Sequence, residues 1–333
     1  MNKKNVLRYI VTGFLLLAAN YALATEELSA PKADIEQSRV QQIVIRAPSL
    51  AGSKLANDAY QPIIVYLPPS YQASKDRYPA VYFLHGYGDR PAQASEFIGL
   101  WDQSARKGGL EAIVVAVNGY NQYGGSFYVN SPVTGNWENF VTQDVVTYID
   151  KHYRTRAKPE YRGLLGYSMG GFGALNIGFK NPDKFKHVMA LCPGLFNEEG
   201  LDKAVAQWTS QNWTAVMEGY AAAFAPDNTR TESPYAHAWN ANDKKVRKMW
   251  ENGFGNWPEK IKAYLSRPDR LQSIRIEYGK HDPFIWITES SSYLSKLLKQ
   301  NNIDHEIYMH NGGHDIAPSA ENIVDFFGRK MTM

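Results

Sequence analysis

The sequence contains almost no cysteine, which excludes a fold that is stabilised by disulfide bonds. Cys192 is the single cysteine among 333 residues, so no intramolecular disulfide can form. No group of cysteines and histidines has the spacing of a zinc site, and we expect no metal. With 44% hydrophobic and 21% charged residues, the composition excludes a disordered, collagen-like or coiled-coil chain. We therefore expect an ordinary hydrophobic core, with Cys192 as a small buried residue within it.

Net charge and long apolar runs are also scarce. The chain has 36 basic and 33 acidic residues, and the excess bases, Lys3, Lys4 and Arg8, all lie in the first 24 residues. Beyond residue 24 the charges balance, so nothing favours nucleic acid or anionic lipid as a partner. The apolar stretch 9–19 has about half of the ~20 residues that a membrane-spanning helix needs, so we expect no stable membrane insertion.

The first 24 residues have instead the pattern of an export signal. A basic start precedes the apolar stretch, and the sequence Ala22-Leu23-Ala24 fits a signal-peptidase site. We predict cleavage after Ala24 and a periplasmic or secreted protein. Residues 25–40 are polar and predict a linker, so that the folded domain begins at residue 41.

Short apolar runs alternate with helix-length segments along most of the chain. From the third run onward most are followed by a helical pattern, which predicts an α/β fold: a mostly parallel eight-stranded sheet with helices on both faces. No helix separates the first two runs, so we expect these to be antiparallel edge strands. The predicted strands are 43–46, 63–67, 80–84, 113–117, 163–165, 188–191, 274–278 and 306–309, and the clearest helices are 137–148, 290–298 and 320–327.

Residues 195–270 interrupt this alternation. The segment has no convincing strand but holds five of the eight tryptophans. We predict a helical cap inserted into the sheet domain, with a separate second domain as the alternative. Aromatic residues of such a cap can line a substrate pocket, although we expect most of these to pack the cap onto the domain. The five are Trp208, Trp213, Trp239, Trp250 and Trp257.

The pentapeptide 166–170 reads Gly-Tyr-Ser-Met-Gly and lies between a predicted strand and a predicted helix. A Gly-x-Ser-x-Gly sequence in this context is typical of a very tight turn that exposes a nucleophilic serine. Gly166 and Gly170 are needed because a β-carbon at either position would collide with the neighbouring chain. We predict Ser168 to be the nucleophile, above the amino end of the following helix.

A serine nucleophile needs a histidine base and an acid that orients it, and in this class they follow the serine in the order acid, histidine. His314 follows the last predicted strand, and its neighbouring glycines allow a turn toward Ser168; His310 is the main competitor. Asp282 follows the penultimate strand and precedes Pro283, which stiffens its presentation. Asp315 and Glu277 are the other acids near the base, but one is adjacent to His314 and the other lies within a strand. We predict a Ser168–Asp282–His314 triad.

The oxyanion formed on attack needs donors that are already in place. We expect one to be the backbone N–H of Met169 and the other that of Tyr87, with Gly86 or Gly88 as alternatives, because the loop 85–89 is glycine-rich and follows the third strand. We further expect Gly86, Tyr87 and Tyr167 to contact substrate.

Four segments together resemble the Putative esterase family of α/β-hydrolases, which includes feruloyl and acetylxylan esterases, S-formylglutathione hydrolase (esterase D), enterochelin esterases and mycolyltransferases. They are 84–88 (LHGYG), 166–171 (GYSMGG), 281–282 (HD) and 313–314 (GH), within a likeness from about 40 to 328. The resemblance implies an α/β-hydrolase fold and serine ester hydrolysis without metal or cofactor. It also implies that the loop 118–130 borders the pocket, where we expect Tyr128 to contact substrate.

The favoured hypothesis is an exported serine ester hydrolase that acts through an acyl-enzyme on a small or carbohydrate-linked ester, such as a feruloyl or acetyl ester. One alternative is an acyltransferase of the mycolyltransferase type, in which an alcohol replaces water. The other is a non-catalytic binding protein with a hydrolase fold. Such proteins usually lack a catalytic residue, whereas every required residue type is present here.

Overall fold

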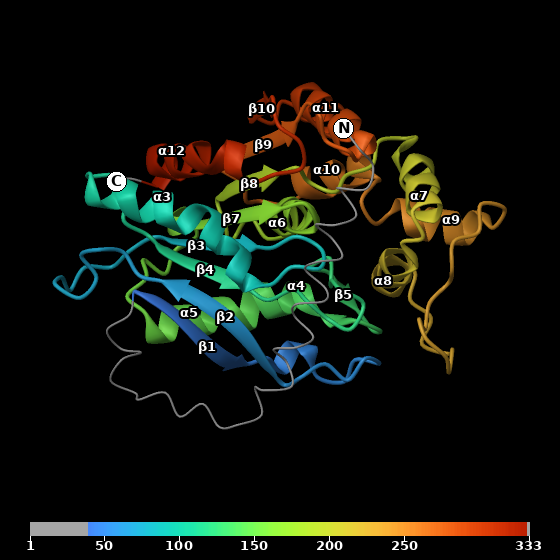
Figure 1. Cartoon of the computed structure of the whole chain (residues 1–333), viewed down its shortest axis with the longest axis horizontal. Coiled ribbons are helices and arrows are strands. Elements are labelled where there is room, and N and C mark those ends of the chain that lie inside the picture. The colour runs from blue at the N-terminus through green and yellow to red at the C-terminus, as the bar shows by residue number, and fades with distance from the viewer. Residues whose placement is uncertain (1–38, 332–333) are drawn as a thin grey trace. The chain divides into compact units, whose positions relative to one another are not determined.

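The computed structural model describes residues 39–331, and its main feature is an eight-stranded sheet with helices on both sides (Figure 1). The predicted export signal, and all of the predicted linker except residues 39 and 40, lie outside the described residues. Within the described residues, 42–331 form one compact unit, which includes the predicted cap segment. No helix within residues 39–331 is long and apolar enough to cross a membrane.

All eight predicted strands are present in the sheet. Their order is β1-β2-β4-β3-β7-β8-β9-β10, and the six strands from β4 to β10 in this order are parallel. As predicted, the first two strands lie at one end of the sheet, and β2 pairs antiparallel with β4. The strands are β1 (Val40–Arg46), β2 (Tyr60–Tyr66), β3 (Ala80–Leu84), β4 (Ile113–Val117), β7 (Arg162–Tyr167), β8 (His187–Leu191), β9 (Ser273–Gly279) and β10 (Glu306–His310), while β5 (Asn130–Ser131) and β6 (Gly135–Asn136) form a separate small hairpin.

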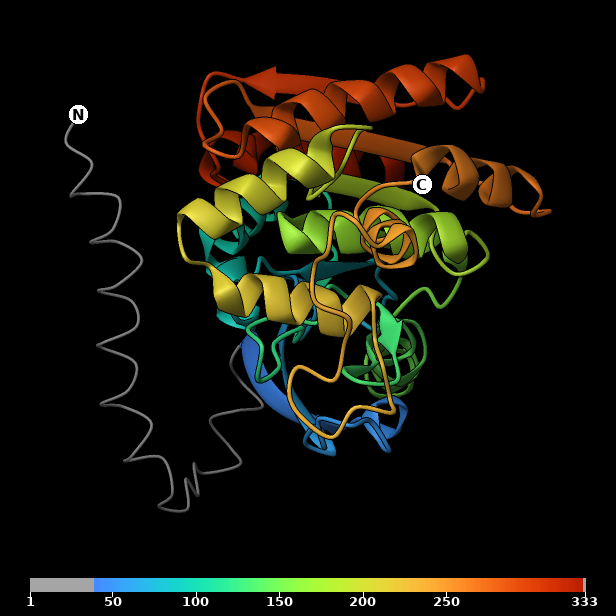
Figure 2. The same ribbon diagram turned by 90° about the vertical axis from the view of Figure 1, so that its right-hand side faces the viewer.

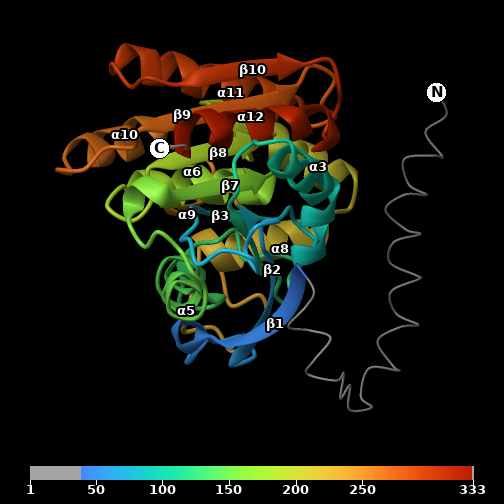
Figure 3. The same cartoon turned by 90° about the vertical axis from the view of Figure 1, so that its left-hand side faces the viewer.

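Helices cover both faces of the sheet, which explains why every residue of β3, β4, β7 and β8 is buried. α12 and α3 lie side by side on one face (Figure 3), where Trp101 approaches Phe327. A β-carbon on Gly163 would meet Phe327, whereas one on Gly166 would overlap the backbone of α6, so α6 covers the opposite face. The helices outside the insertion are α3 (Ser95–Arg106), α4 (Trp137–Asn139), α5 (Val146–His152), α6 (Met169–Lys180), α11 (Ile285–Gln300) and α12 (Ala320–Met331), and a π-helical segment, Phe140–Val145, joins α4 to α5.

The segment 195–270 is helical, and its only β-type contact among the described residues is the isolated bridge between Pro226 and Ala236. Its helices lie across one side of the domain (Figure 2), and α10 packs against α6. Three of its tryptophans, Trp208, Trp250 and Trp257, are buried, in keeping with a packing role. The helices are α7 (Gly200–Ser210), α8 (Thr214–Phe224), α9 (Lys244–Glu251) and α10 (Trp257–Leu265).

An aromatic cluster joins this helical segment to the sheet domain. Phe127, from the loop after β4, has its ring 5.5 Å from that of Tyr220 and 5.4 Å from that of Phe224, both on α8. On the other side, Phe172 of α6 lies 4.8 Å from Phe254. Each such pair contributes about 0.5–1.5 kcal/mol beyond the burial of its surface. The insertion is therefore held on the domain by shared core packing.

Candidate active site

The predicted site residues follow four different strands but meet at one edge of the sheet. Ser168 follows β7, and the loop that contains Tyr87 follows the neighbouring strand β3, with Leu84 paired to Gly166. Asp282 and His314 follow β9 and β10, which are also parallel neighbours. Because carboxyl ends of parallel strands share an edge, all four loops lie close together.

Ser168 occupies a strained turn between β7 and α6. Its backbone has φ +55° and ψ −113°, a conformation that side-chain-bearing residues rarely adopt. A β-carbon on Gly166 would overlap the carbonyl of Gly170, and one on Gly170 would overlap the carbonyl of Leu84. The Ser168 N–H donates to the carbonyl of Leu191 at 2.8 Å. Glycine at both flanking positions is thus a steric requirement, as the sequence predicted.

His314 lies between the serine and the acid. Its Nε2 is 2.9 Å from Ser168 Oγ, and its Nδ1 is 2.7 Å from Asp282 Oδ2. The Asp282 side chain is fully buried, and its other oxygen accepts the Phe284 N–H at 2.8 Å. This pattern assigns the imidazole proton to Nδ1 and leaves Nε2 free to accept the serine proton.

The competing histidine and acids have other contacts. His310 is buried at the end of β10, where its Nδ1 accepts the Gly312 N–H. Asp315 is exposed and accepts the Gly313 N–H at 3.1 Å. Glu277 is fully buried and pairs with Arg275. The structure therefore brings His314 and Asp282 to Ser168 and leaves His310, Asp315 and Glu277 outside this set of contacts.

Tyr167 is largely buried and holds the loop that carries His314. Its hydroxyl donates to the backbone carbonyl of His314 at 2.8 Å, its ring lies 5.1 Å from the imidazole, and only 8% of its surface is exposed. A β-carbon on Gly279 would overlap the carbonyl of Gly313, so the loop is also packed against the end of β9. The glycines near His314 thus permit a close approach to β9. The low exposure of Tyr167 does not support the prediction that it contacts substrate.

Hydrogen bonds in the loop after β3 distinguish the candidate oxyanion donors. The Gly86 N–H donates to the side chain of Gln93 at 3.0 Å, and the Gly88 N–H donates to the carbonyl of Gly124 at 2.9 Å. Within residues 39–331, the N–H groups of Tyr87 and Met169 donate no hydrogen bond. Gly86 is itself covered, because a β-carbon there would lie 3.1 Å from the ring of Tyr167.

His85 holds the loop after β3 in place through hydrogen bonds of a neutral imidazole. Its Nε2 accepts the Gly119 N–H at 2.9 Å, so its Nδ1 carries the proton and donates to the carbonyl of Gly86 at 2.8 Å. Burial lowers the pKa of His85 to about 4, and nearby Arg90 adds to the shift. The residue therefore links the loop after β3 to the loop after β4 without carrying charge near neutral pH.

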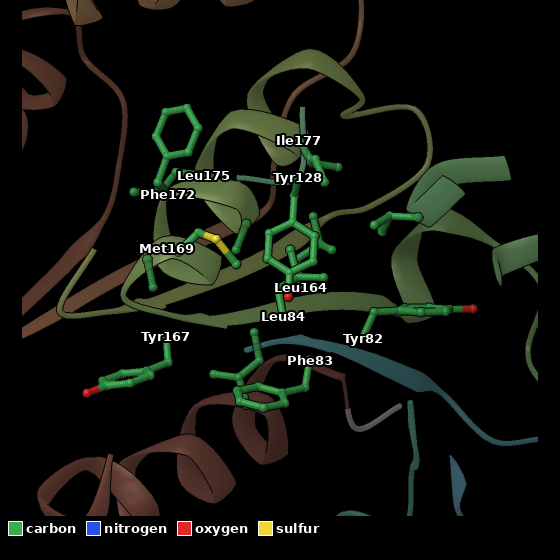
Figure 4. Close-up of a cluster of buried hydrophobic side chains, with 14 of the residues drawn as sticks. Tyr82, Phe83, Leu84, Tyr128, Leu164, Tyr167, Met169, Phe172, Leu175 and Ile177 are labelled. Carbon is green, nitrogen blue, oxygen red and sulfur yellow. The ribbon is translucent and has the colours of Figure 1, made fainter. Parts of the chain in front are cut away.

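Tyr128 belongs to the core, which corrects the prediction that it contacts substrate. Its side chain has no exposed surface, and its hydroxyl donates to the carbonyl of His85 at 3.3 Å. Figure 4 shows its ring among the buried side chains of β3, β7 and α6. A β-carbon on Gly173 of α6 would lie 2.8 Å from this ring, so the ring fills the space that the glycine leaves.

Cys192 is buried, as predicted, but it also lies beside Asp282 and His314, which the sequence did not indicate. Ligand atoms of Cys192, Asp282 and His314 all lie within 4.8 Å of one another, a grouping that could hold a metal. However, Asp282 and His314 already share a hydrogen bond, and burial raises the pKa of the thiol to about 12. The thiol is therefore protonated near neutral pH, and the contacts favour the hydrogen-bonded pair of Asp282 and His314 over a metal site.

Comparison with known sequences identifies the family. The model of the family described as Putative esterase matches residues 58–329. The chain belongs to this esterase family. An esterase of Mycobacterium tuberculosis is 34% identical over 122 residues, which are 35% of this chain and 25% of that protein. The S-formylglutathione hydrolase of Mus musculus is 32% identical over 148 residues, 39% of this chain and 50% of the enzyme. The matches thus span half or less of these curated relatives.

Solved structures share the fold at low sequence identity. A ferulic acid esterase has a TM-score of 0.59 at 20% identity, covering 88% of this chain and 99% of that one. A fluorophosphonate-binding serine hydrolase of Staphylococcus aureus has a TM-score of 0.62 at 15% identity, covering 88% and 98%. These likenesses establish the α/β-hydrolase fold that the sequence predicted.

Proposed function

We propose that the protein is a serine carboxylic ester hydrolase with Ser168 as nucleophile, His314 as general base and Asp282 as the acid that orients it. The observation that carries this proposal is the position of His314, within hydrogen-bonding distance of both the serine hydroxyl and the buried carboxylate. The strained backbone of Ser168 and the membership in an esterase family support it.

The arrangement can perform ester hydrolysis in two half-reactions. Ser168 Oγ attacks the ester carbonyl while His314 Nε2 takes its proton, and the oxyanion is stabilised by the N–H groups of Tyr87 and Met169. The tetrahedral intermediate collapses, the C–O bond to the alcohol breaks, and the imidazolium protonates the alcohol. Water then attacks the acyl-enzyme with its proton passing to His314, and collapse of the second intermediate returns that proton to Ser168 and releases the acid.

We propose a small or carbohydrate-linked ester as substrate, and export of the protein. A protein of Xylanibacter ruminicola named endo-1,4-beta-xylanase/feruloyl esterase is 25% identical over 233 residues, which are 60% of this chain and 31% of that protein. This supports acylated plant polysaccharides as a source of substrate. The pattern of residues 1–24 supports export, and N-terminal sequencing of the exported protein should begin at Thr25. An N-terminus at Met1 would contradict the export proposal.

The proposed nucleophile can be tested with a fluorophosphonate probe. The wild-type protein should be labelled and Ser168→Ala should not, whereas Ser210→Ala, an exposed serine on α7, should be labelled like wild type. Asp282→Asn should lower kcat on p-nitrophenyl acetate by about 10⁴-fold, because the imidazole loses its orienting partner. Labelling of Ser168→Ala, or full activity of Asp282→Asn, would refute the assignment. Product analysis with a competing alcohol separates hydrolysis from acyl transfer.

A further inference from the structure

A row of aromatic rings leads from the catalytic imidazole onto the helical insertion. The ring of Phe284 meets that of His314 edge-on at 4.8 Å between centroids. The ring of Trp213 lies 5.6 Å beyond, tilted against Phe284. Phe284 and Trp213 are both half-buried, so each keeps part of its surface accessible.

The helix that begins after Trp213, α8, lies near two loops of the site: the loop after β9, which carries Asp282, and the loop after β3, which carries Tyr87. Trp213 is the N-cap of α8, beside Phe284 of the loop after β9. Six residues further along, a β-carbon on Gly219 would lie 3.1 Å from Tyr123 and 3.6 Å from the hydroxyl of Tyr87. α8 therefore runs from the Asp282 side of the site to the oxyanion side.

Met217 is a third apolar side chain in this region, in addition to the rings of Phe284 and Trp213. It lies four residues after Trp213 and hence on the same face of the helix, and it is also half-buried. Its sulfur is 3.9 Å from Thr209 Oγ1, which fixes it at the junction of α7 and α8. Two aromatic rings and a thioether suit an aromatic ring as neighbour, because edge-to-face and sulfur–aromatic contacts are both favourable. Together they offer a single hydrogen-bond donor, the Trp213 indole N–H, which is too little for a sugar.

We propose that Trp213, Met217 and Phe284 form a subsite for an aromatic ring of the ester substrate. This inference rests on the proposed ester hydrolysis and assigns the insertion a role in substrate choice. The ring can belong to the acid, as in a hydroxycinnamoyl ester, or to the alcohol, as in an aryl acetate.

The test compares four esters on the wild type and on Trp213→Ala. Methyl cinnamate carries the ring on the acid and naphthyl acetate on the alcohol; methyl butyrate and ethyl acetate are their non-aromatic counterparts. We expect Trp213→Ala to lower kcat/KM by roughly tenfold for an aromatic ester and less than about twofold for both non-aromatic ones. Whichever aromatic ester loses activity shows whether the bound ring belongs to the acid or to the alcohol. Trp213→Phe should restore part of the loss. Equal losses on all four esters, or no loss, would overturn the proposal.

Trp239→Ala is the matched control. Trp239 is a half-buried tryptophan of the same insertion, but its ring packs on Trp250 and Arg247 instead of on Phe284. It should leave the ratio between aromatic and non-aromatic esters unchanged. A second measurement needs no turnover. In the Ser168→Ala background, Trp213→Ala should raise the Kd of whichever aromatic ester binds more tightly, by about the same factor as the loss of kcat/KM. Unchanged binding would overturn the subsite whether or not the protein is a hydrolase. Unchanged fluorophosphonate labelling of Trp213→Ala would show that Ser168 is still reactive, so a failure of the subsite can be told from a failure of the hydrolase assignment.

Discussion

The buried imidazole of His85 makes the stability of the protein sensitive to acid. In the unfolded chain its pKa is near 6.5, whereas burial lowers it to about 4 in the native state. The unfolded chain therefore binds a proton first as the pH falls, and stability that is complete above about pH 6.5 is lost on the way down to about pH 4. The full difference corresponds to about 3 kcal/mol, and roughly 2 kcal/mol of it is lost by about pH 4.5.

His85→Gln isolates this contribution. A glutamine at this position can still accept the Gly119 N–H but does not titrate, so the variant should lose less stability between about pH 7.5 and pH 4.5 than the wild type, by roughly 2 kcal/mol. Urea unfolding followed by tryptophan fluorescence at the two pH values measures this difference. His187 and His310, whose pKa values are also lowered by burial, are present in both proteins and cancel. Identical acid losses in the two proteins would show that His85 is not held neutral by the fold.

Two further predictions concern the turn at Ser168 and the thiol of Cys192. Gly170→Ala should destabilise the protein by about 3 kcal/mol or more, because its β-carbon would overlap the carbonyl of Leu84, whereas Gly99→Ala, in open space on α3, should be neutral or stabilising by up to about 1 kcal/mol in thermal unfolding. Similar effects of the two changes would contradict the steric reasoning. Cys192 should resist iodoacetamide at neutral pH in the folded protein and react in urea, since its thiol is buried and protonated; rapid labelling of the native protein would contradict this.

The fold could be predicted because its signals are local. Each strand is a short apolar run between turn residues, and the parallel arrangement follows from the helices between them. The turn at Ser168 is equally local, because Gly166 and Gly170 are required by clashes within the turn and with the neighbouring strand. The choice of Asp282 and His314 combined the order acid, histidine along the chain with their places after the last two strands, since residues after parallel strands share one edge.

The supporting contacts could not be predicted, because they join residues far apart in the chain. Gln93 takes the Gly86 N–H from a later turn, and this contact, unseen in the sequence, favours Tyr87 as the donor. Tyr128 lies within the loop 118–130, which we expected to border the site, yet its ring fills a space left by Gly173 of α6. Cys192 resembles any small buried residue in sequence; only its place after β8, beside β9, brings it near Asp282.

Tyr167 illustrates the same limit and leads to the most specific prediction about the proposed triad. Its place next to Ser168 suggested a substrate contact, but its hydroxyl donates a hydrogen bond to the backbone carbonyl of His314. Tyr167→Phe keeps the ring and removes that hydrogen bond, so the imidazole loses part of its alignment. Small misplacement of a catalytic group can cost up to about 10²-fold in rate, and we expect kcat to fall by roughly tenfold or more with KM little changed.

The split between kcat and KM distinguishes a positioning role from a substrate contact. Loss of a substrate contact would instead raise KM, and a merely structural role would lower stability without changing kcat. Tyr220→Phe provides the comparison, because that buried hydroxyl donates to the carbonyl of Trp250 within the insertion and has no contact with His314. Both variants should lose about 1 kcal/mol of stability, and only Tyr167→Phe should lose kcat. A wild-type kcat in Tyr167→Phe would mean that β9 and the buried carboxylate align the imidazole without it.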